Sequence, residues 1–300
     1  MVMISLTSGQ LRGSMPPLVT PFVDGEIDLD TYASLVDWHA EEGSHGVVVC
    51  SGRTGESGAL STAERRRLAV VAVDAADGRV EVVVAIDCLS RVDALELADH
   101  AGRIGAAGTV VEAPSSTTHR CDGLVDLFVE IAARTELPVL VHTCRDRDTV
   151  DVDLGMITEL ALFAPNFVGL LQSSADLGLV TEALITFGCD FRILAGSESF
   201  AMMALGAQGA VDSVANVVPR WVTELYYAVA KDGFSEGRAS NDRLFDLRRV
   251  VGANSDPLPL KYMMWRLGLL PNTEHRGRLR QQTLAVTTRL DALLVMLGAC

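Results

Sequence analysis

Short apolar segments alternate along the chain with longer segments in which apolar residues recur every three or four positions. The apolar segments are rich in β-branched residues and nearly free of polar ones, which is typical of parallel strands covered on both faces. We predict strands at Met15–Thr20, Gly46–Cys50, Val80–Ile86, Thr109–Glu112, Pro138–Thr143, Phe167–Leu171, Arg192–Ala195 and Ala210–Val214. The segments between them predict helices at Leu29–Glu42, Thr62–Ala76, Arg91–Ile104, Leu124–Arg134, Leu154–Phe163, Leu177–Thr186 and Ser199–Leu205.

Parallel strands must be joined by crossover connections, here helices, and eight such strands close an α/β TIM (β/α)8 barrel. After about Pro219 the alternation stops, and helices alone are predicted, at Trp221–Lys231, Ser235–Val251, Leu258–Leu267 and Thr273–Leu297. We therefore expect a barrel over residues 1–220 and a C-terminal helical extension over 221–300 packed on it. In such barrels the functional groups lie at the C-terminal ends of the strands.

The net charge and the composition of the chain limit the kinds of molecule that the protein is expected to bind. The net charge of −14, from 39 acidic and 25 basic residues, disfavours binding to nucleic acid but leaves small anionic ligands open. The six cysteines contain no CxxC pair and indicate reduced thiols. Neither a signal peptide nor an apolar segment of membrane-spanning length is predicted, so we expect a cytoplasmic protein. The glycines form no dinucleotide or phosphate-binding motif, and no cofactor is expected.

Several motifs follow one another in a fixed order between residues 13 and 270. They are Pro17–Phe22 (PLVTPF), Ser51–Glu56 (SGRTGE) with Leu60–Arg65 (LSTAER), Leu137–His142 (LPVLVH), Asn166–Gln172 (NFVGLLQ), Gly206–Asn216 (GAQGAVDSVAN) and Pro257–Lys261 (PLPLK). In content and spacing this series resembles the dihydrodipicolinate synthase / N-acetylneuraminate lyase family. The resemblance implies a TIM barrel, lyase chemistry on a 2-oxo acid, and assembly into a homodimer or homotetramer.

At several catalytic positions the chain departs from that family's pattern. The family's lysine at the end of strand six forms a Schiff base with the 2-oxo acid, and the resemblance puts Leu171 in its place. The chain has only two lysines, Lys231 and Lys261, and neither falls at a predicted strand end. The tyrosine of strand five is replaced by His142, and the partner-subunit tyrosine after strand four by Ser116.

The acid-binding positions of the family are retained. The resemblance assigns Arg147 to the substrate carboxylate and Gly196 to the edge of the pocket, and a guanidinium suits a carboxylate well. Arg53 replaces the first threonine of the family's glycine-rich loop and is a second candidate, beside Thr54. The remaining candidate liners are polar residues at strand ends: Gln172, Ser173, Ser197 and Asp212.

Each candidate also has a structural interpretation. His142 either transfers protons near neutral pH or fills the space of the tyrosine as a packed, hydrogen-bonded side chain. Arg147 either grips a carboxylate or pairs with Asp146 or Asp148 on the surface, and Arg53 has the same two interpretations. Glu56 is expected to hold the glycine-rich loop through backbone N–H groups.

Three hypotheses for function follow. In the first, the protein is a lyase-like enzyme that binds a small carboxylate or 2-oxo acid and works without a Schiff base, so that dihydrodipicolinate synthase activity is not expected. In the second, it is a catalytically silent family member that binds a ligand or serves in assembly. In the third, a metal replaces the imine, held by the two His-x-Cys pairs His119/Cys121 and His142/Cys144.

Overall fold

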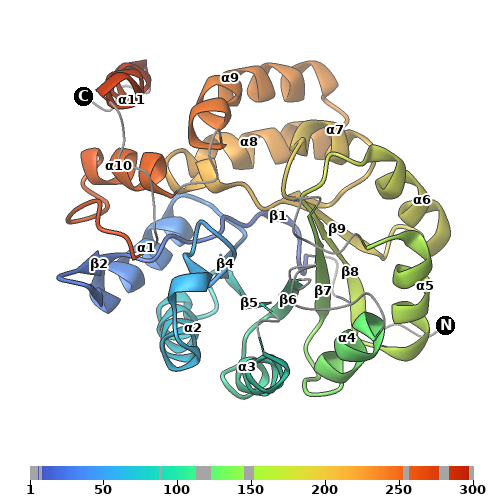
Figure 1. The fold of residues 1–300 in the computed structure, drawn as a ribbon. Coiled ribbons are helices and arrows are strands. Elements are labelled where there is room, and N and C mark those ends of the chain that lie inside the picture. The colour runs from blue at the N-terminus through green and yellow to red at the C-terminus, as the bar shows by residue number, and fades with distance from the viewer. Residues whose placement is uncertain are drawn as a thin grey trace.

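Eight parallel strands form the centre of the chain's structure, a computed structural model that describes residues 6, 9–87, 90–112, 123–144, 152–252, 257–276 and 284–296 (Figure 1). The strands are β1 (Gly13–Ser14), β4 (Gly46–Val49), β5 (Glu81–Asp87), β6 (Gly108–Glu112), β7 (Val139–Thr143), β8 (Phe167–Gln172), β9 (Arg192–Ala195) and β10 (Gly209–Ala210). Each of β4 to β9 pairs with the next along the chain, and β9 is followed by β10 and then β1.

The sheet closes on itself through the segment after β1. Pro17 forms a parallel bridge with Val48 of β4, the Leu18 N–H donates to the Val48 carbonyl at 2.9 Å, and the Val48 N–H donates to Pro16 at 2.9 Å. A sheet closed in this way has no free edge, so the predicted TIM barrel is confirmed.

Helices surround the barrel, and their boundaries agree with the sequence pattern to within about two residues. They are α1 (Leu29–Glu41), α2 (Thr62–Ala76), α3 (Arg91–Arg103), α4 (Leu124–Ala132), α5 (Leu154–Phe163), α6 (Leu177–Phe187), α7 (Ser199–Ala204) and α8 (Pro219–Ala230). Local capping sets several starts: Ser61 and Glu64 form a capping box at α2, and Asp28, Ser90, Asp153 and Asp176 cap α1, α3, α5 and α6. A short hairpin of β2 (Phe22–Val23) and β3 (Glu26–Ile27) precedes α1.

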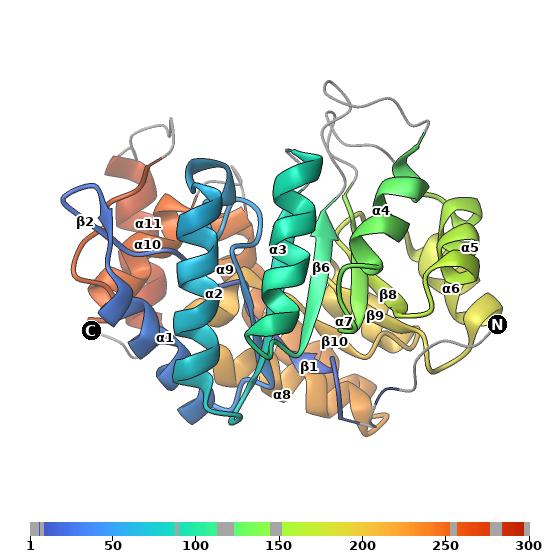
Figure 2. The ribbon, with the colours of Figure 1, turned by 90° about the horizontal axis from the view of Figure 1, so that it is seen from below.

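The C-terminal part of the chain packs on one side of the barrel (Figures 1 and 2). It contains α9 (Phe234–Gly252), α10 (Leu258–Arg266) and α11 (Leu284–Met296). The helix α8 contacts β1 and β10 and so occupies the place of the eighth barrel helix, and the boundary expected at 220/221 falls within it. None of the helices in the described part of the chain is long and apolar enough to cross a membrane.

Three predicted boundaries were wrong. The first strand comprises Gly13–Ser14 rather than Met15–Thr20, because Pro16 and Pro17 have no N–H to donate to a ladder. The last comprises Gly209–Ala210, since the chain turns into a short 3-10 helix, η2 (Ser213–Asn216), whose first turn Asp212 caps. Residues 273–276 are not helical, because they run along the barrel loops and bond to them.

Two apolar layers hold the fold together. Inside the barrel the buried cluster comprises Leu11, Met15, Val48, Val83, Ala85, Val110, Leu140, Val168, Leu171, Leu194 and Val211. A second, larger core lies between the strands and the helices and continues under α9, α10 and α11. The barrel interior is therefore packed and not a pore, and polar groups face inward at its C-terminal end.

Candidate active site

Neighbouring strands of the barrel bring five residues into one ring at its C-terminal end. In register, Asp87 of β5 pairs with Glu112 of β6, Glu112 with His142 of β7, His142 with Leu171 of β8, and Leu171 with Leu194 of β9. Residues paired in this way share a face of the sheet. Because Leu171 and Leu194 belong to the interior cluster, the side chains of Asp87, Glu112 and His142 also face the interior.

His142 lies between a hydroxyl and a carboxylate. Its Nε2 is 2.8 Å from Ser173 Oγ, just beyond β8, and its Nδ1 is 3.8 Å from Glu112 Oε1. The His142 side chain is 18% exposed, and burial lowers its pKa to about 4. The imidazole is therefore neutral at neutral pH and can accept a proton.

The carboxyl group of Glu112 keeps its proton to a higher pH than that of an ordinary glutamate. Burial, followed by the negative charge of Asp87, raises its pKa to about 7. The carboxylate of Asp87 is itself paired with Arg65 of α2 at 2.5 Å, and Arg65 also donates to the Ser57 carbonyl at 2.6 Å. Ser51 donates to Glu112 Oε1 at 3.3 Å. Near neutral pH, Glu112 is thus divided between its acid and its carboxylate.

Gly196, predicted to lie beside the pocket, is in direct contact with Ser173. A Cβ at position 196 would come within 2.1 Å of Ser173 Oγ, so any side chain there would displace the hydroxyl from His142. The Gly196 N–H donates to the Gln172 carbonyl at 2.8 Å, which fixes this approach. The close packing of β8 against β9 therefore requires glycine at this position.

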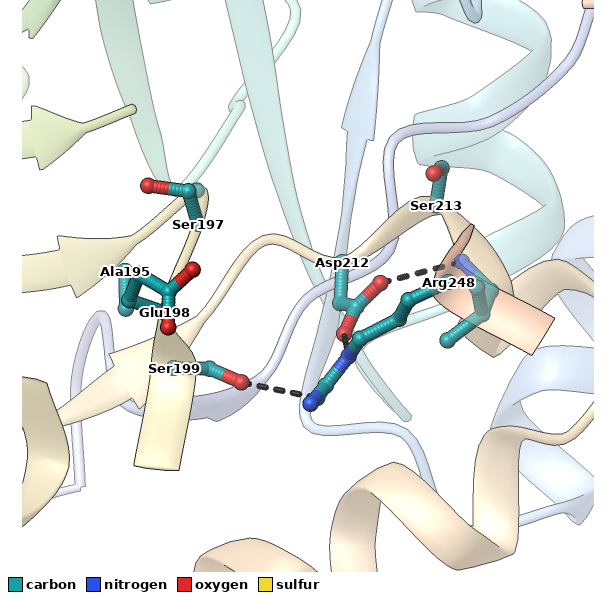
Figure 3. A pocket seen from close by; sticks show the side chains of 9 residues that line it. Ala195, Ser197, Glu198, Ser199, Asp212, Ser213 and Arg248 are labelled. Carbon is teal, nitrogen blue, oxygen red and sulfur yellow. Dashed lines mark hydrogen bonds and ion pairs between the residues drawn. The ribbon is translucent and has the colours of Figure 1, made fainter. Parts of the chain in front are cut away.

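From Gly196 a pocket of about 250 Å³ extends between the ends of β9 and β10 (Figure 3). Arg248 of α9 reaches into it and contacts Asp212 at 2.8 Å, Ser199 at 2.7 Å and Asn241 at 2.7 Å. Asp212 and Ser197, which the sequence predicts as liners from their positions at strand ends, both line the pocket. The sequence did not predict Arg248, because nothing in the sequence of a C-terminal helix indicates which of its residues contacts the ends of the barrel strands.

The other predicted residues are placed less favourably or are not described. Arg53 is exposed and Thr54 half-buried, on the loop after β4. Gln172 lies on the opposite face of β8 from Leu171, is 0% exposed, and bonds to Thr143 and Ser174. It therefore cannot line the barrel mouth, and we leave it out of the site. The remaining predicted residues, Arg147, Ser116, His119 and Cys121, lie outside the described residues.

The two lysines of the chain lie away from the ring. Lys261 of α10 is 0% exposed, forms an ion pair with Glu56, and donates to the Glu274 carbonyl at 2.7 Å. Lys231 follows the last turn of α8. That end of α8 lies at the opposite end of the barrel, since Tyr227 in the preceding turn contacts His45 at 3.2 Å, just before β4.

The described part of the chain offers the metal hypothesis no ligand set. Within the described ranges no three His, Cys, Asp or Glu side chains are arranged to hold a metal ion. His142 and Cys144 fall in these ranges, whereas the other His-x-Cys pair does not. The ring of Asp87, Glu112 and His142 accordingly offers acid–base groups and not a ligand set.

Comparison with known proteins places the chain in a family. Residues 10–294 match the profile of the Dihydrodipicolinate synthetase family. The 4-hydroxy-tetrahydrodipicolinate synthase of Aquifex aeolicus is 31% identical over 271 residues, which cover 88% of this chain and 92% of that protein. The enzyme of the same name from Methylobacterium radiotolerans is 32% identical over 288 residues, 92% of this chain and 96% of that one.

Solved structures agree with the sequence comparison. The crystal structure of dihydrodipicolinate synthase from Aquifex aeolicus superposes with a TM-score of 0.91 at 29% identity, over 96% of this chain and 99% of that one. The enzyme from Acinetobacter baumannii, solved in complex with pyruvate, gives 0.90 at 25% identity, over 97% and 100% of the two chains. The motifs, the closed barrel and these matches together show that the chain belongs to the dihydrodipicolinate synthetase family.

Proposed function

We propose that this protein binds a small 2-oxo or carboxylic acid at the C-terminal mouth of the barrel and acts on it as a lyase without forming a Schiff base. The observation that carries the proposal is the position of Leu171. Its side chain faces the barrel interior in register with His142 and is 2% exposed, at the strand-six position that the family resemblance gives to the lysine.

Imine formation requires a primary amine that can reach the substrate carbonyl. Leucine has none, the Lys261 ammonium is paired with Glu56, and Lys231 lies at the other end of the barrel. His142 remains as an ionisable group in the ring and is the group that we assign to proton transfer. We assign the substrate carboxylate to Arg147, as the resemblance suggests, and Arg53 is a second candidate for the same role.

Other expectations from the sequence stay proposals. We propose a cytoplasmic homodimer or homotetramer that needs no cofactor. Support for the ligand class comes from the Acinetobacter baumannii enzyme, whose structure was solved in complex with pyruvate. The charge balance of the chain, −14 in total, argues against nucleic acid as a partner.

Reductive trapping tests the absence of an imine. The protein is incubated with pyruvate and sodium borohydride, and its intact mass is measured. We expect no adduct on the wild type and a single pyruvyl adduct on Leu171→Lys, because that variant restores an amine at the inward-facing position. Leu171→Met, which has a similar volume and no amine, is the matched control. An adduct on Lys231 or Lys261 of the wild-type protein would refute the proposal.

Ligand binding and turnover separate the lyase from a silent family member. Pyruvate is expected to raise the thermal unfolding temperature of the wild type. Turnover across a panel of aldol and dehydratase substrates should fall by about a hundredfold or more in His142→Asn, the usual scale for loss of a general base. Stabilisation without turnover of any substrate in the panel would favour the silent alternative.

A further inference from the structure

A hydroxyl, an imidazole and a carboxyl group follow one another at the barrel mouth. Ser173 Oγ is 2.8 Å from His142 Nε2, and the other ring nitrogen, Nδ1, is 3.8 Å from Glu112 Oε1. We infer that Ser173 is a nucleophile, activated by His142 and oriented through Glu112, and that the mouth of this barrel carries out acyl transfer on small esters. This activity goes beyond the proposed lyase function and does not depend on it.

The geometry meets the requirements for an activated serine. A hydroxyl becomes a nucleophile when a base lies within hydrogen-bond reach and a third group orients that base. The two nitrogens of His142 are divided between hydroxyl and carboxylate in the same sense as in the Ser-His-Asp arrangement of hydrolases. The contact to Glu112, at 3.8 Å, is longer than a hydrogen bond and acts through charge.

The barrel itself fixes the three groups. Glu112 and His142 are register partners on β6 and β7, so their side chains leave the sheet side by side. Ser173 follows the residue paired with Thr143, and its N–H donates to the Thr143 carbonyl at 2.8 Å. Two residues beyond Leu171, it emerges on the same inward face. Groups carried on neighbouring strands are positioned more rigidly than groups on separate loops.

Two carboxyl groups lie in the ring with His142, those of Asp87 and Glu112, and the one that faces the imidazole is Glu112. Asp87, on β5, is engaged by Arg65 of α2 at 2.5 Å. Ser51, on the loop after β4, donates to Glu112 at 3.3 Å. The pKa of His142, about 4, keeps the base unprotonated at pH 7, and that of Glu112, about 7, makes its orienting charge appear as the pH rises through neutrality.

A pocket large enough for an acyl group adjoins Gly196, which contacts Ser173, although Ser173 itself is not one of its lining residues. Ser173 is partly exposed, and the absent side chain of Gly196 leaves its hydroxyl room. The pocket of about 250 Å³ begins at Gly196 and extends to Arg248, whose guanidinium could meet a carboxylate on the acyl chain in exchange for Asp212 (Figure 3). The ligand class is thus a small ester, preferentially one that carries a second, free acid group.

The reaction balances without any further reagent. Ser173 Oγ bonds to the ester carbonyl carbon while its proton moves to His142 Nε2. The bond from that carbon to the alkoxy oxygen breaks, and the leaving oxygen takes the proton from His142. A water molecule, deprotonated by His142, then attacks the acyl-serine, which releases the carboxylic acid and returns the proton to Ser173.

Labelling with a fluorophosphonate probe, followed by peptide mass mapping, tests the assignment. We expect the label on Ser173 in the wild type and none on Ser173→Ala. The labelling rate should fall about a hundredfold or more in His142→Asn. It should rise as the pH passes through about 7 in the wild type but not in Glu112→Gln. Ser174→Ala, which changes the neighbouring buried serine bonded to Gln172, is the control and should label at the wild-type rate.

Three outcomes would overturn the inference: no label on the wild type, a label at another residue, or equal labelling of Ser173→Ala. Hydrolysis of p-nitrophenyl acetate, compared between wild type and Ser173→Ala, gives a second readout, and circular dichroism confirms that each variant is folded. Pyruvate-induced thermal stabilisation of the same samples reports on the proposed function. Because the two measurements use different ligands, either can fail without the other.

Discussion

Lys261 and Glu56 connect the C-terminal helices to the loop at the barrel mouth, and replacing the lysine should be strongly destabilising. The side chains of Lys261 and Glu56 are 0% and 4% exposed. Phe22 lies under the ammonium, with its ring centroid 4.7 Å from Nζ. Lys261→Met removes the positive charge at similar side-chain volume and leaves the Glu56 carboxylate buried.

The size of the effect follows from what remains around Glu56. Breaking a buried ion pair by removing one partner costs about 3–5 kcal/mol. Glu56 would keep the hydrogen bond from the Arg276 N–H at 2.9 Å, so we expect the lower end, about 3 kcal/mol of unfolding free energy. The double variant Lys261→Met/Glu56→Gln has no buried charge at this place and should recover most of that loss.

Urea denaturation followed by tryptophan fluorescence measures these free energies. Lys231→Met, which changes the exposed lysine at the end of α8, is the matched control and should stay within about 0.5 kcal/mol of wild type. A Lys261→Met protein within about 1 kcal/mol of wild type would refute the reasoning. So would a double variant as unstable as the sum of the two single variants, since removal of the pair must be non-additive.

Three further predictions concern stability and the site. Burial lowers the pKa of His39 from 6.5 to about 3, so as the pH falls the unfolded chain is protonated before the folded one. The free energy of unfolding should therefore fall between about pH 6.5 and 3, and His39→Asn should flatten this dependence in denaturation curves. Glu112, with its pKa raised from 4.5 to about 7, acts in the opposite direction. Its contribution is full below about pH 4.5 and lost as the pH rises through 7, so Glu112→Gln should become more stable relative to wild type over that range. Gly196→Ala should displace Ser173 and weaken pyruvate-induced stabilisation, whereas Gly58→Ala, with nothing within 4 Å of the new Cβ, should not.

The sequence was sufficient to predict the barrel because its strands carry a strong signal. Segments such as Phe167–Gln172 are buried at every position, and a short segment of this kind is typical of a strand covered on both faces. The errors arose where backbone chemistry mattered more than hydrophobicity. Pro16 and Pro17 interrupt an apolar segment that otherwise resembles a strand, and residues 273–276 have helical composition but are held by Glu56 and Gly25.

The site was predicted only in part, because its members are set by which face of a strand each residue occupies. Alternation along β8 could have shown that Gln172 faces away from Leu171. The same alternation along β6 would have singled out Glu112, which the sequence shows only as the polar end of an apolar segment. The contact of Arg248 with Asp212 joins residues 36 positions apart, and no periodicity in either segment encodes it.

The filled interior of the barrel also determines how a ligand would enter and leave the site. Leu140, Leu171 and Leu194 are at most 2% exposed and close the barrel at and below the level of the ring, so a ligand at the mouth would enter and leave by the same opening. A reaction between two substrates here would consequently run in a set sequence. The substrate that contacts Leu171 would bind first and its product would dissociate last. An excess of the second substrate would slow that dissociation.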